Sequence, residues 1–115
     1  GHLVYSNAGH PHAFVVRSDG APERLAATSP PLGIVPFNRY GEAAVDWHGG
    51  DLLCLFTDGL SDAIATGQSG ESRVLETVGC RRAEPVKQIL EGVFDIPNAA
   101  NGLPADDRTA VLVRV

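Results

Sequence analysis

The sequence has no extended run of basic residues, only two cysteines and no long hydrophobic stretch. The net charge is −5, which argues against nucleic acid and anionic membrane surfaces as partners. The longest apolar run covers residues 52–56, far short of the roughly 20 residues that a membrane-spanning helix needs. No secretory leader is visible, and we therefore expect a cytoplasmic protein.

Several common catalytic motifs are also missing. Cys54 and Cys80 fit neither a disulfide framework nor a zinc pattern, and neither has the arginine six positions downstream that marks cysteine phosphatases. The phosphate-binding patterns GxGxxG and GxxxxGK[ST] do not occur. Ser61 in "GLSDA" resembles a nucleophile elbow, but the triad histidine of that fold follows the serine, and the last histidine here is His48.

The sequence does contain enough residues for one small domain and many turn formers, with 13 glycines and 8 prolines among 115 residues. The run at 52–56 shows no alternation, which predicts a central strand covered on both faces. Residues 85–95 carry apolar side chains at helical spacing. We expect strands at 3–6, 12–17, 24–27, 43–47, 52–56 and 109–115, and helices at 72–81 and 85–95. This order predicts an α+β fold.

Carboxylates are the remaining candidates for chemistry. Asp58 ends the central strand, and Asp106 and Asp107 precede the last one. Asp-Gly is a common turn dipeptide, and an aspartate pair in a loop is often simply solvated, so a structural interpretation of each stays open. Two aspartate segments at strand ends could also converge on one hard cation, because Mg²⁺ and Mn²⁺ prefer carboxylate oxygen.

The order of the motifs makes the second interpretation stronger. The chain contains "NAGHP", an Asp-Gly turn, "PPLGI", "GGDLLCLFTDGLSDA" and "PADDRTAVLV", in that order. This order resembles the C-terminal part of the SpoIIE-like branch of PPM-type protein serine/threonine phosphatases, over residues 3–115. The resemblance implies an antiparallel β-sandwich flanked by helices, in four layers and incomplete at the N-terminus. Residues 1–115 would then be the C-terminal portion of a single phosphatase domain.

The same resemblance implies a centre of two Mn²⁺ or Mg²⁺ ions, in which a water between the metals attacks phosphorus. Asp58 and Asp106 match the family's metal-binding aspartates, and Asp107 is the second choice beside Asp106. Gly59 would let the backbone pass close to the metals.

Other polar residues near these motifs have more than one interpretation. His10 and Arg108 are candidates to line the site or to contact phosphate. A histidine pair such as His10 and His12 can bind a metal, but in a turn these side chains are more often solvated or capping groups. Arg108 could equally form a surface ion pair.

The family's first metal-binding segment has no counterpart in this sequence, so we expect an incomplete two-metal centre and little or no activity from this chain alone. The alternative is a non-catalytic binding or oligomerisation module with the same fold. By resemblance, the substrate would be a phosphoserine or phosphothreonine protein, such as an anti-sigma-factor antagonist of a bacterial regulatory circuit. Strand edges that lack partners would favour self-association into a homo-oligomer.

Overall fold

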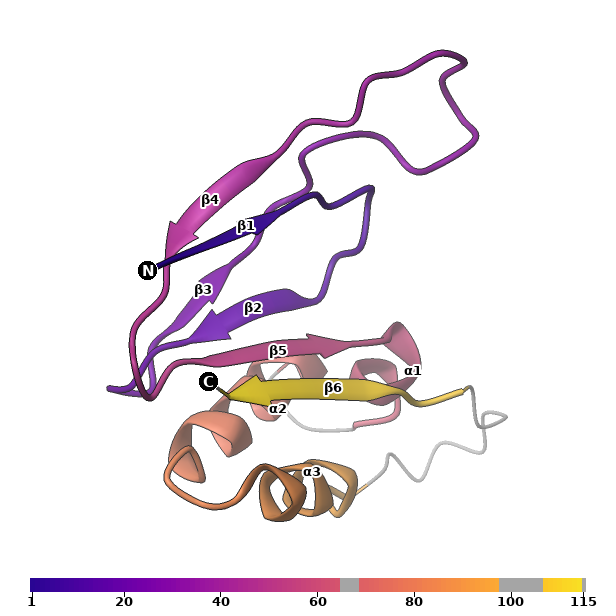
Figure 1. Ribbon diagram of the computed structural model, residues 1–115. Coiled ribbons are helices and arrows are strands. Elements are labelled where there is room, and N and C mark those ends of the chain that lie inside the picture. The colour runs from indigo at the N-terminus through magenta and orange to yellow at the C-terminus, as the bar shows by residue number, and fades with distance from the viewer. Residues whose placement is uncertain (65–68, 98–106, 115) are drawn as a thin grey trace.

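The computed structural model describes residues 1–64, 69–97 and 107–114, which form two antiparallel sheets and three helices (Figure 1). The strands are β1 (His2–Tyr5), β2 (Ala13–Val16), β3 (Pro22–Arg24), β4 (Ala43–Asp46), β5 (Leu52–Phe56) and β6 (Ala110–Arg114). The helices are α1 (Asp58–Asp62), α2 (Gly70–Cys80) and α3 (Val86–Phe94), all between β5 and β6 in the chain. The predicted α+β class is confirmed.

The larger sheet has the strand order β3-β2-β5-β6, and β1 pairs with β4 in a separate two-stranded sheet. Cys54 of β5 lies opposite Phe14 on one side and Leu112 on the other. The reversal after β1 therefore carries the chain from one sheet to the other and does not form a hairpin. The connection from β4 to β5 crosses between the sheets in the same way.

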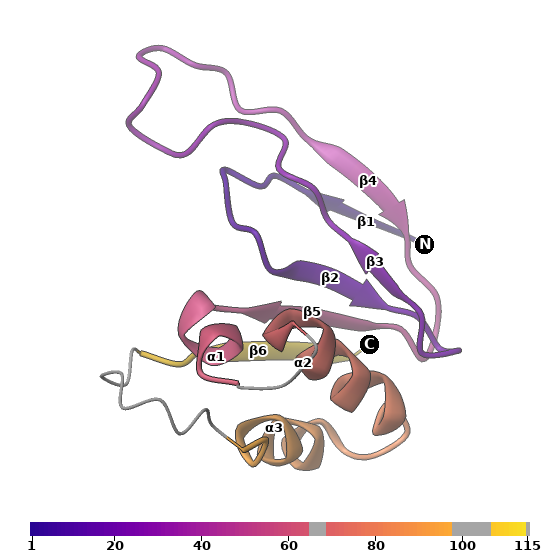
Figure 2. The ribbon, with the colours of Figure 1, turned by 180° about the vertical axis from the view of Figure 1, so that it is seen from behind.

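The molecule has three layers, with the helices on one face of the larger sheet and the β1–β4 sheet on the other (Figures 1 and 2). Strand β2 is buried throughout because its side chains alternate between these layers. Phe14 and Val16 pack toward the helices, while Ala13 and Val15 join the core beneath β1 and β4. Burial on both faces is the reason that β2 and β5 read as apolar runs.

The helices pack on the sheet through the periodic apolar positions seen in the sequence. Val74 and Val78 of α2 and Ile89 and Val93 of α3 are at most 2% exposed and share one core with β2, β5 and β6. Helix α2 begins where the Ser69 side chain accepts a hydrogen bond from the backbone N–H of Ser72, at 3.2 Å. Among the described helices, none has the length and apolar content to cross a membrane.

Two local features differ from the sequence-based expectation. Strand β3 lies at Pro22–Arg24, earlier than the predicted 24–27, because the pairing with β2 ends at Arg24 opposite Phe14. Beyond Arg24 the chain turns toward the turn after β1, where the Thr28 N–H donates to the Asn7 carbonyl. Helix α1 was not predicted, because five residues are too few for a helical repeat. Cys54 is a buried core residue as expected.

Candidate metal and phosphate site

The two aspartate segments lie side by side because Thr57 joins the end of β5 to the residues before β6. The Thr57 N–H donates to the Thr109 carbonyl at 3.0 Å, and the Thr57 hydroxyl accepts from the Thr109 N–H at 3.1 Å. The same hydroxyl donates to the Asp107 carbonyl at 3.4 Å. The backbone of Asp107 is thus fixed beside Asp58, whereas Asp106 lies outside the described residues.

Asp58 is the first residue of α1, directly beyond the buried strand β5. Its side chain is 65% exposed, and its Oδ1 lies 2.6 Å from Nε2 of His12. Gly59, the next residue, is buried in α1. The position of Asp58 therefore combines a carboxylate open to solvent with one oxygen held by a histidine.

His12 lies between two carboxylates and is only 12% exposed, so the expectation of a solvated turn histidine is wrong for this residue. Its Nε2 faces Asp58, and its Nδ1 lies 2.6 Å from Oε2 of Glu71 in the first turn of α2. Imidazole donates to both carboxylates only in its imidazolium form. The ring also stacks on Phe56, with centroids 4.7 Å apart and planes 8° from parallel.

Glu71 uses its other oxygen to pair with Arg24 of β3, so one carboxylate joins α2 to β3 and to the residue that precedes β2. Burial by itself would raise the pKa of Glu71. The hydrogen bonds from Arg24 and His12 outweigh that effect and hold the pKa below its usual range. Glu71 is therefore an anion at neutral pH and keeps both partners in place.

Two phenylalanine rings of the larger sheet, Phe14 and Phe56, pack against Arg24 and His12. The guanidinium of Arg24 lies 4.6 Å from the centroid of the Phe14 ring, a cation–π contact between cross-strand neighbours. Phe14 in turn stacks near Phe56, with centroids 6.1 Å apart. Arg24, Phe14 and Phe56 thus form a row across β3, β2 and β5, and His12, just before β2, stacks on Phe56 at its end. Sequence reasoning missed this row because strand pairing, and not proximity in the sequence, brings its members together.

No histidine follows Ser61 in the sequence, but the fold places His12, which precedes it, next to its side chain. The distance between Ser61 Oγ and His12 Nε2 is 3.4 Å, and Glu71 lies on the far side of the ring. The serine hydroxyl nevertheless donates to the Asp58 carbonyl at 3.2 Å, and Ser61 is 6% exposed. Ser61 therefore stabilises α1 and is not placed as a nucleophile.

His10 and Arg108, the candidates for contacts to phosphate, lie at the edges of this region. The buried Asn7 fixes the backbone of His10 by accepting from its N–H and donating to its carbonyl, at 2.7 and 2.9 Å. His10 is one of the residues that line a cavity of about 390 Å³ between the two sheets, and its ring centroid is 6.5 Å from that of His12. Arg108 lies over the Phe94 ring of α3, with its guanidinium 5.7 Å from the centroid.

The described ranges contain no group of three or more His, Cys, Asp or Glu residues close enough to hold a metal ion. The oxygen donors that are described, Asp58 and the segment of Asp107, suit a hard divalent cation in their chemistry. Two such groups are fewer than the three that the described residues would need to form a metal site.

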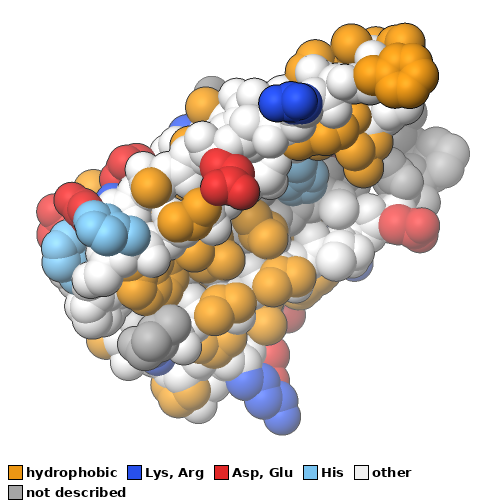
Figure 3. Space-filling model, turned by 45° about the horizontal axis from the view of Figure 1, so that its top comes forward, with side chains coloured by type: hydrophobic (Ala, Val, Ile, Leu, Met, Phe, Trp, Pro, Cys, Tyr) orange, Lys and Arg blue, Asp and Glu red, His pale blue; other side chains and the backbone are white. Residues whose placement is uncertain are grey.

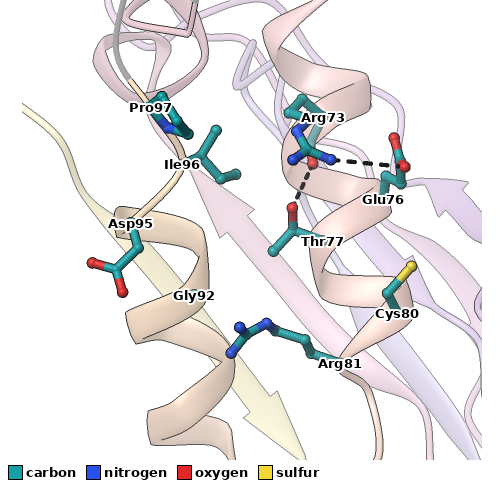
Figure 4. A pocket seen from close by; sticks show the side chains of 9 residues that line it. All are labelled: Arg73, Glu76, Thr77, Cys80, Arg81, Gly92, Asp95, Ile96 and Pro97. Carbon is teal, nitrogen blue, oxygen red and sulfur yellow. Dashed lines mark hydrogen bonds and ion pairs between the residues drawn. The ribbon is translucent and has the colours of Figure 1, made fainter.

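A separate pocket of about 300 Å³ lies between α2 and α3 (Figure 4). Its cationic residues pair with acidic residues of their own turns, Arg73 with Glu76 at 3.7 Å and Arg81 with Glu84 at 3.5 Å. Asp58, Glu71 and Asp107 do not line it. This pocket is therefore distinct from the candidate site.

Comparison with known proteins identifies the family of the chain. A family model described as Stage II sporulation protein E (SpoIIE) matches residues 1–115. Protein IcfG of Synechocystis sp. is 34% identical over 121 residues, covering 98% of this chain and 18% of that protein. The phosphoserine phosphatase RsbP of Bacillus subtilis is 36% identical over 64 residues, covering 56% of this chain and 16% of that protein.

The structure of the chain is also similar to solved structures. The SiaA-PP2C domain of Pseudomonas aeruginosa superposes with a TM-score of 0.74 at 20% identity, covering 99% of this chain and 46% of that one. The chain spans less than half the length of each of these three proteins. The chain belongs to the SpoIIE family, and its antiparallel sheets and helices are those of a PPM-type (PP2C) phosphatase domain.

Proposed function

We propose that residues 1–115 are the C-terminal portion of a phosphatase domain that hydrolyses phosphoserine or phosphothreonine on a protein, with Mn²⁺ or Mg²⁺ as cofactor. The observation that carries this proposal is the hydrogen bonding of Thr57 to Thr109 and Asp107, which sets Asp58 beside the second aspartate segment. Membership of the SpoIIE family and a relative named as a phosphoserine phosphatase support the reaction.

In this proposal Asp58, Asp106 and Asp107 hold the divalent cations, and the backbone at Gly59 passes close to them. The cations, when bound, supply Lewis acidity and a water nucleophile at neutral pH. Asp58 contributes an exposed carboxylate whose orientation is fixed by His12. His10 and Arg108 are proposed to contact the phosphate from the two sides of the site.

A protein substrate is supported by an apolar loop at the same end of the sheet. The loop between β3 and β4 carries five exposed hydrophobic side chains: Leu32, Ile34, Val35, Phe37 and Tyr40. Hydrophobic side chains gather at the tip that this loop forms (Figure 3), and such patches often mark protein interaction sites. Thr28 and Asn7 tie the loop to the turn that leads to His12. We propose a phosphorylated anti-sigma-factor antagonist as the protein that docks here.

A second candidate is a non-catalytic binding module with the same fold. The observation that favours it is the lack of a three-residue metal cluster among residues 1–64, 69–97 and 107–114. A module of this kind would use the apolar loop alone, and Asp58 would only begin α1. The two candidates differ in whether Asp58 is needed for binding a cation.

Calorimetric titration with Mn²⁺ tests the proposal on the chain itself. We expect weak Mn²⁺ binding that Asp58→Asn abolishes, because the substitution removes the carboxylate charge. Asp46→Asn is the matched control, since Asp46 is an exposed aspartate on β4, in the other sheet. Hydrolysis of a phosphoserine peptide, followed in parallel, is expected to be low and to disappear with Asp58→Asn.

Mn²⁺ binding that is unchanged by Asp58→Asn would overturn the assignment of Asp58 as a ligand. An equal loss with Asp46→Asn would show that the titration reports surface charge in general. Either result would favour the non-catalytic module.

A further inference from the structure

We propose that His12 is the positioning residue of Asp58, and that Glu71 and Arg24 hold His12 in place from the start of α2 and from β3. The orientation of the candidate metal-binding carboxylate would then be set by the first turn of α2. This inference rests on the proposed role of Asp58 as a metal ligand.

The first step is the contact between His12 and Asp58. One carboxylate oxygen lies 2.6 Å from Nε2 of His12, while the Asp58 side chain as a whole stays 65% exposed. The carboxylate is therefore fixed in rotation without being closed off from solvent. Carboxylates that bind metals are usually oriented by a hydrogen bond from a residue that does not itself bind the metal.

The second step is that the His12 ring has little freedom of its own. Phe56 stacks on its face at 4.7 Å, Glu71 binds Nδ1 at 2.6 Å, and only 12% of the side chain is exposed. Both ring nitrogens and one face of the ring have partners, so the ring cannot turn away from Asp58 without losing a contact. A histidine in this setting holds a position and does not sample several.

The third step connects the ring to the helix. Glu71 binds His12 with one oxygen and Arg24 with the other, and Arg24 lies against Phe14. Gly70, the neighbour of Glu71, packs on the Ser61 carbonyl of α1 so closely that a β-carbon would lie 1.8 Å from that oxygen. The start of α2 therefore contacts both His12 and the helix that begins with Asp58. A shift of the first turn of α2 would therefore displace the Asp58 carboxylate in two ways, through His12 and through α1.

Mn²⁺ titration of a set of variants tests the inference. His12→Ala is expected to weaken Mn²⁺ binding about tenfold, the low end of the cost of losing such a partner. His12→Gln should retain most of the affinity, because its amide N–H can replace the donor to Asp58. Glu71→Gln should weaken binding in the wild-type background and have no further effect when combined with His12→Ala.

Matched controls separate this role from a general loss of charge or stability. His2→Ala removes an exposed histidine, and Glu76→Gln removes an acidic group from the same helix. Both are expected to bind Mn²⁺ as the unaltered chain does. A metal-free measurement is independent of affinity, since Glu71→Gln should shift the side-chain carboxyl ¹³C resonance of Asp58 and Glu76→Gln should not.

The outcomes distinguish this inference from the proposed function. If Asp58→Asn abolishes Mn²⁺ binding while His12→Ala and Glu71→Gln do not weaken it, the positioning role is wrong and the metal role stands. If Asp58→Asn has no effect on binding, the metal assignment itself is wrong. An Asp58 resonance that ignores Glu71→Gln would overturn the contact that the inference requires, whatever the affinity.

Discussion

Gly70 packs against the backbone carbonyl of Ser61, with no room for a side chain between α1 and α2. An ideal β-carbon on Gly70 would lie 1.8 Å from the Ser61 oxygen and 2.6 Å from its carbonyl carbon. Backbone atoms cannot move aside as the end of a flexible side chain can. The glycine therefore sets the spacing of the two helices beside Asp58.

Gly70→Ala is expected to lower the free energy of unfolding by about 1–3 kcal/mol, the usual cost of overpacking. Gly49→Ala is the control, because nothing lies within 4 Å of a β-carbon at Gly49 and no left-handed backbone is needed there. Its effect should stay within about 0.5 kcal/mol. Urea denaturation followed by circular dichroism measures both, and equal stability of the two variants would refute the close packing.

Asp51 is expected to be a strong stabilising residue, although it lies at the opposite end of β5 from Asp58 and takes no part in the candidate site. It is 1% exposed and accepts hydrogen bonds from the His48 N–H, the Ser18 N–H and Arg17. Asp51→Asn should lower the free energy of unfolding at pH 7 by about 1–3 kcal/mol, because a buried partner of Arg17 loses its charge. Urea denaturation measures the difference from the unaltered chain.

The contribution of Asp51 should depend on pH in a definite direction. Burial by itself would raise the pKa of Asp51, but the N–H groups of His48 and Ser18 and the Arg17 guanidinium lower it below the ordinary 3.8. Its stabilisation is therefore full above about pH 4 and is lost as the pH falls through the lowered pKa. The difference between Asp51→Asn and the unaltered chain should shrink below pH 4. A constant difference down to pH 2.5 would contradict this linkage.

The two cysteines should react with alkylating reagents at very different rates. Burial raises the pKa of the Cys54 thiol to about 12, and its side chain is 2% exposed, whereas Cys80 is exposed at the end of α2. Since the thiolate is the nucleophile, iodoacetamide at pH 8 should modify Cys80 and leave Cys54 intact in the folded chain. Mass spectrometry of the native Cys80→Ser variant should show no label. Labelling of that variant would mean that the β5 core opens readily.

The sequence predicted the features that depend on neighbouring residues. The apolar run at 52–56 is a central strand, and the periodic apolar positions of 85–95 pack on the core except for Phe94, which is exposed. The placement of Asp58 just beyond a strand also follows from local pattern. Strand–turn boundaries and helical periodicity are properties of a few consecutive residues, so they can be read without the fold.

The partners of His12 could not be predicted in the same way. His12 is 46 residues from Asp58 and 59 from Glu71, and nothing in the sequence around any of the three indicates the others. Their meeting depends on the crossing of the chain from β1 to β2 and on the packing of α2 over the larger sheet. A turn histidine and a helix-start glutamate each have an ordinary local explanation, which is why the cluster stayed hidden.

The strand order β3-β2-β5-β6 also affects how the chain reaches this state during synthesis. β5 leaves the ribosome well before β6, and until β6 follows, one hydrogen-bonding edge of an apolar strand has no partner. The helices made in the interval cover the face of β5 and not its edge. Open edges of this composition recruit other chains, and a pairing so distant in sequence forms slowly. The yield of native protein should therefore depend on chaperones that shield a nascent chain.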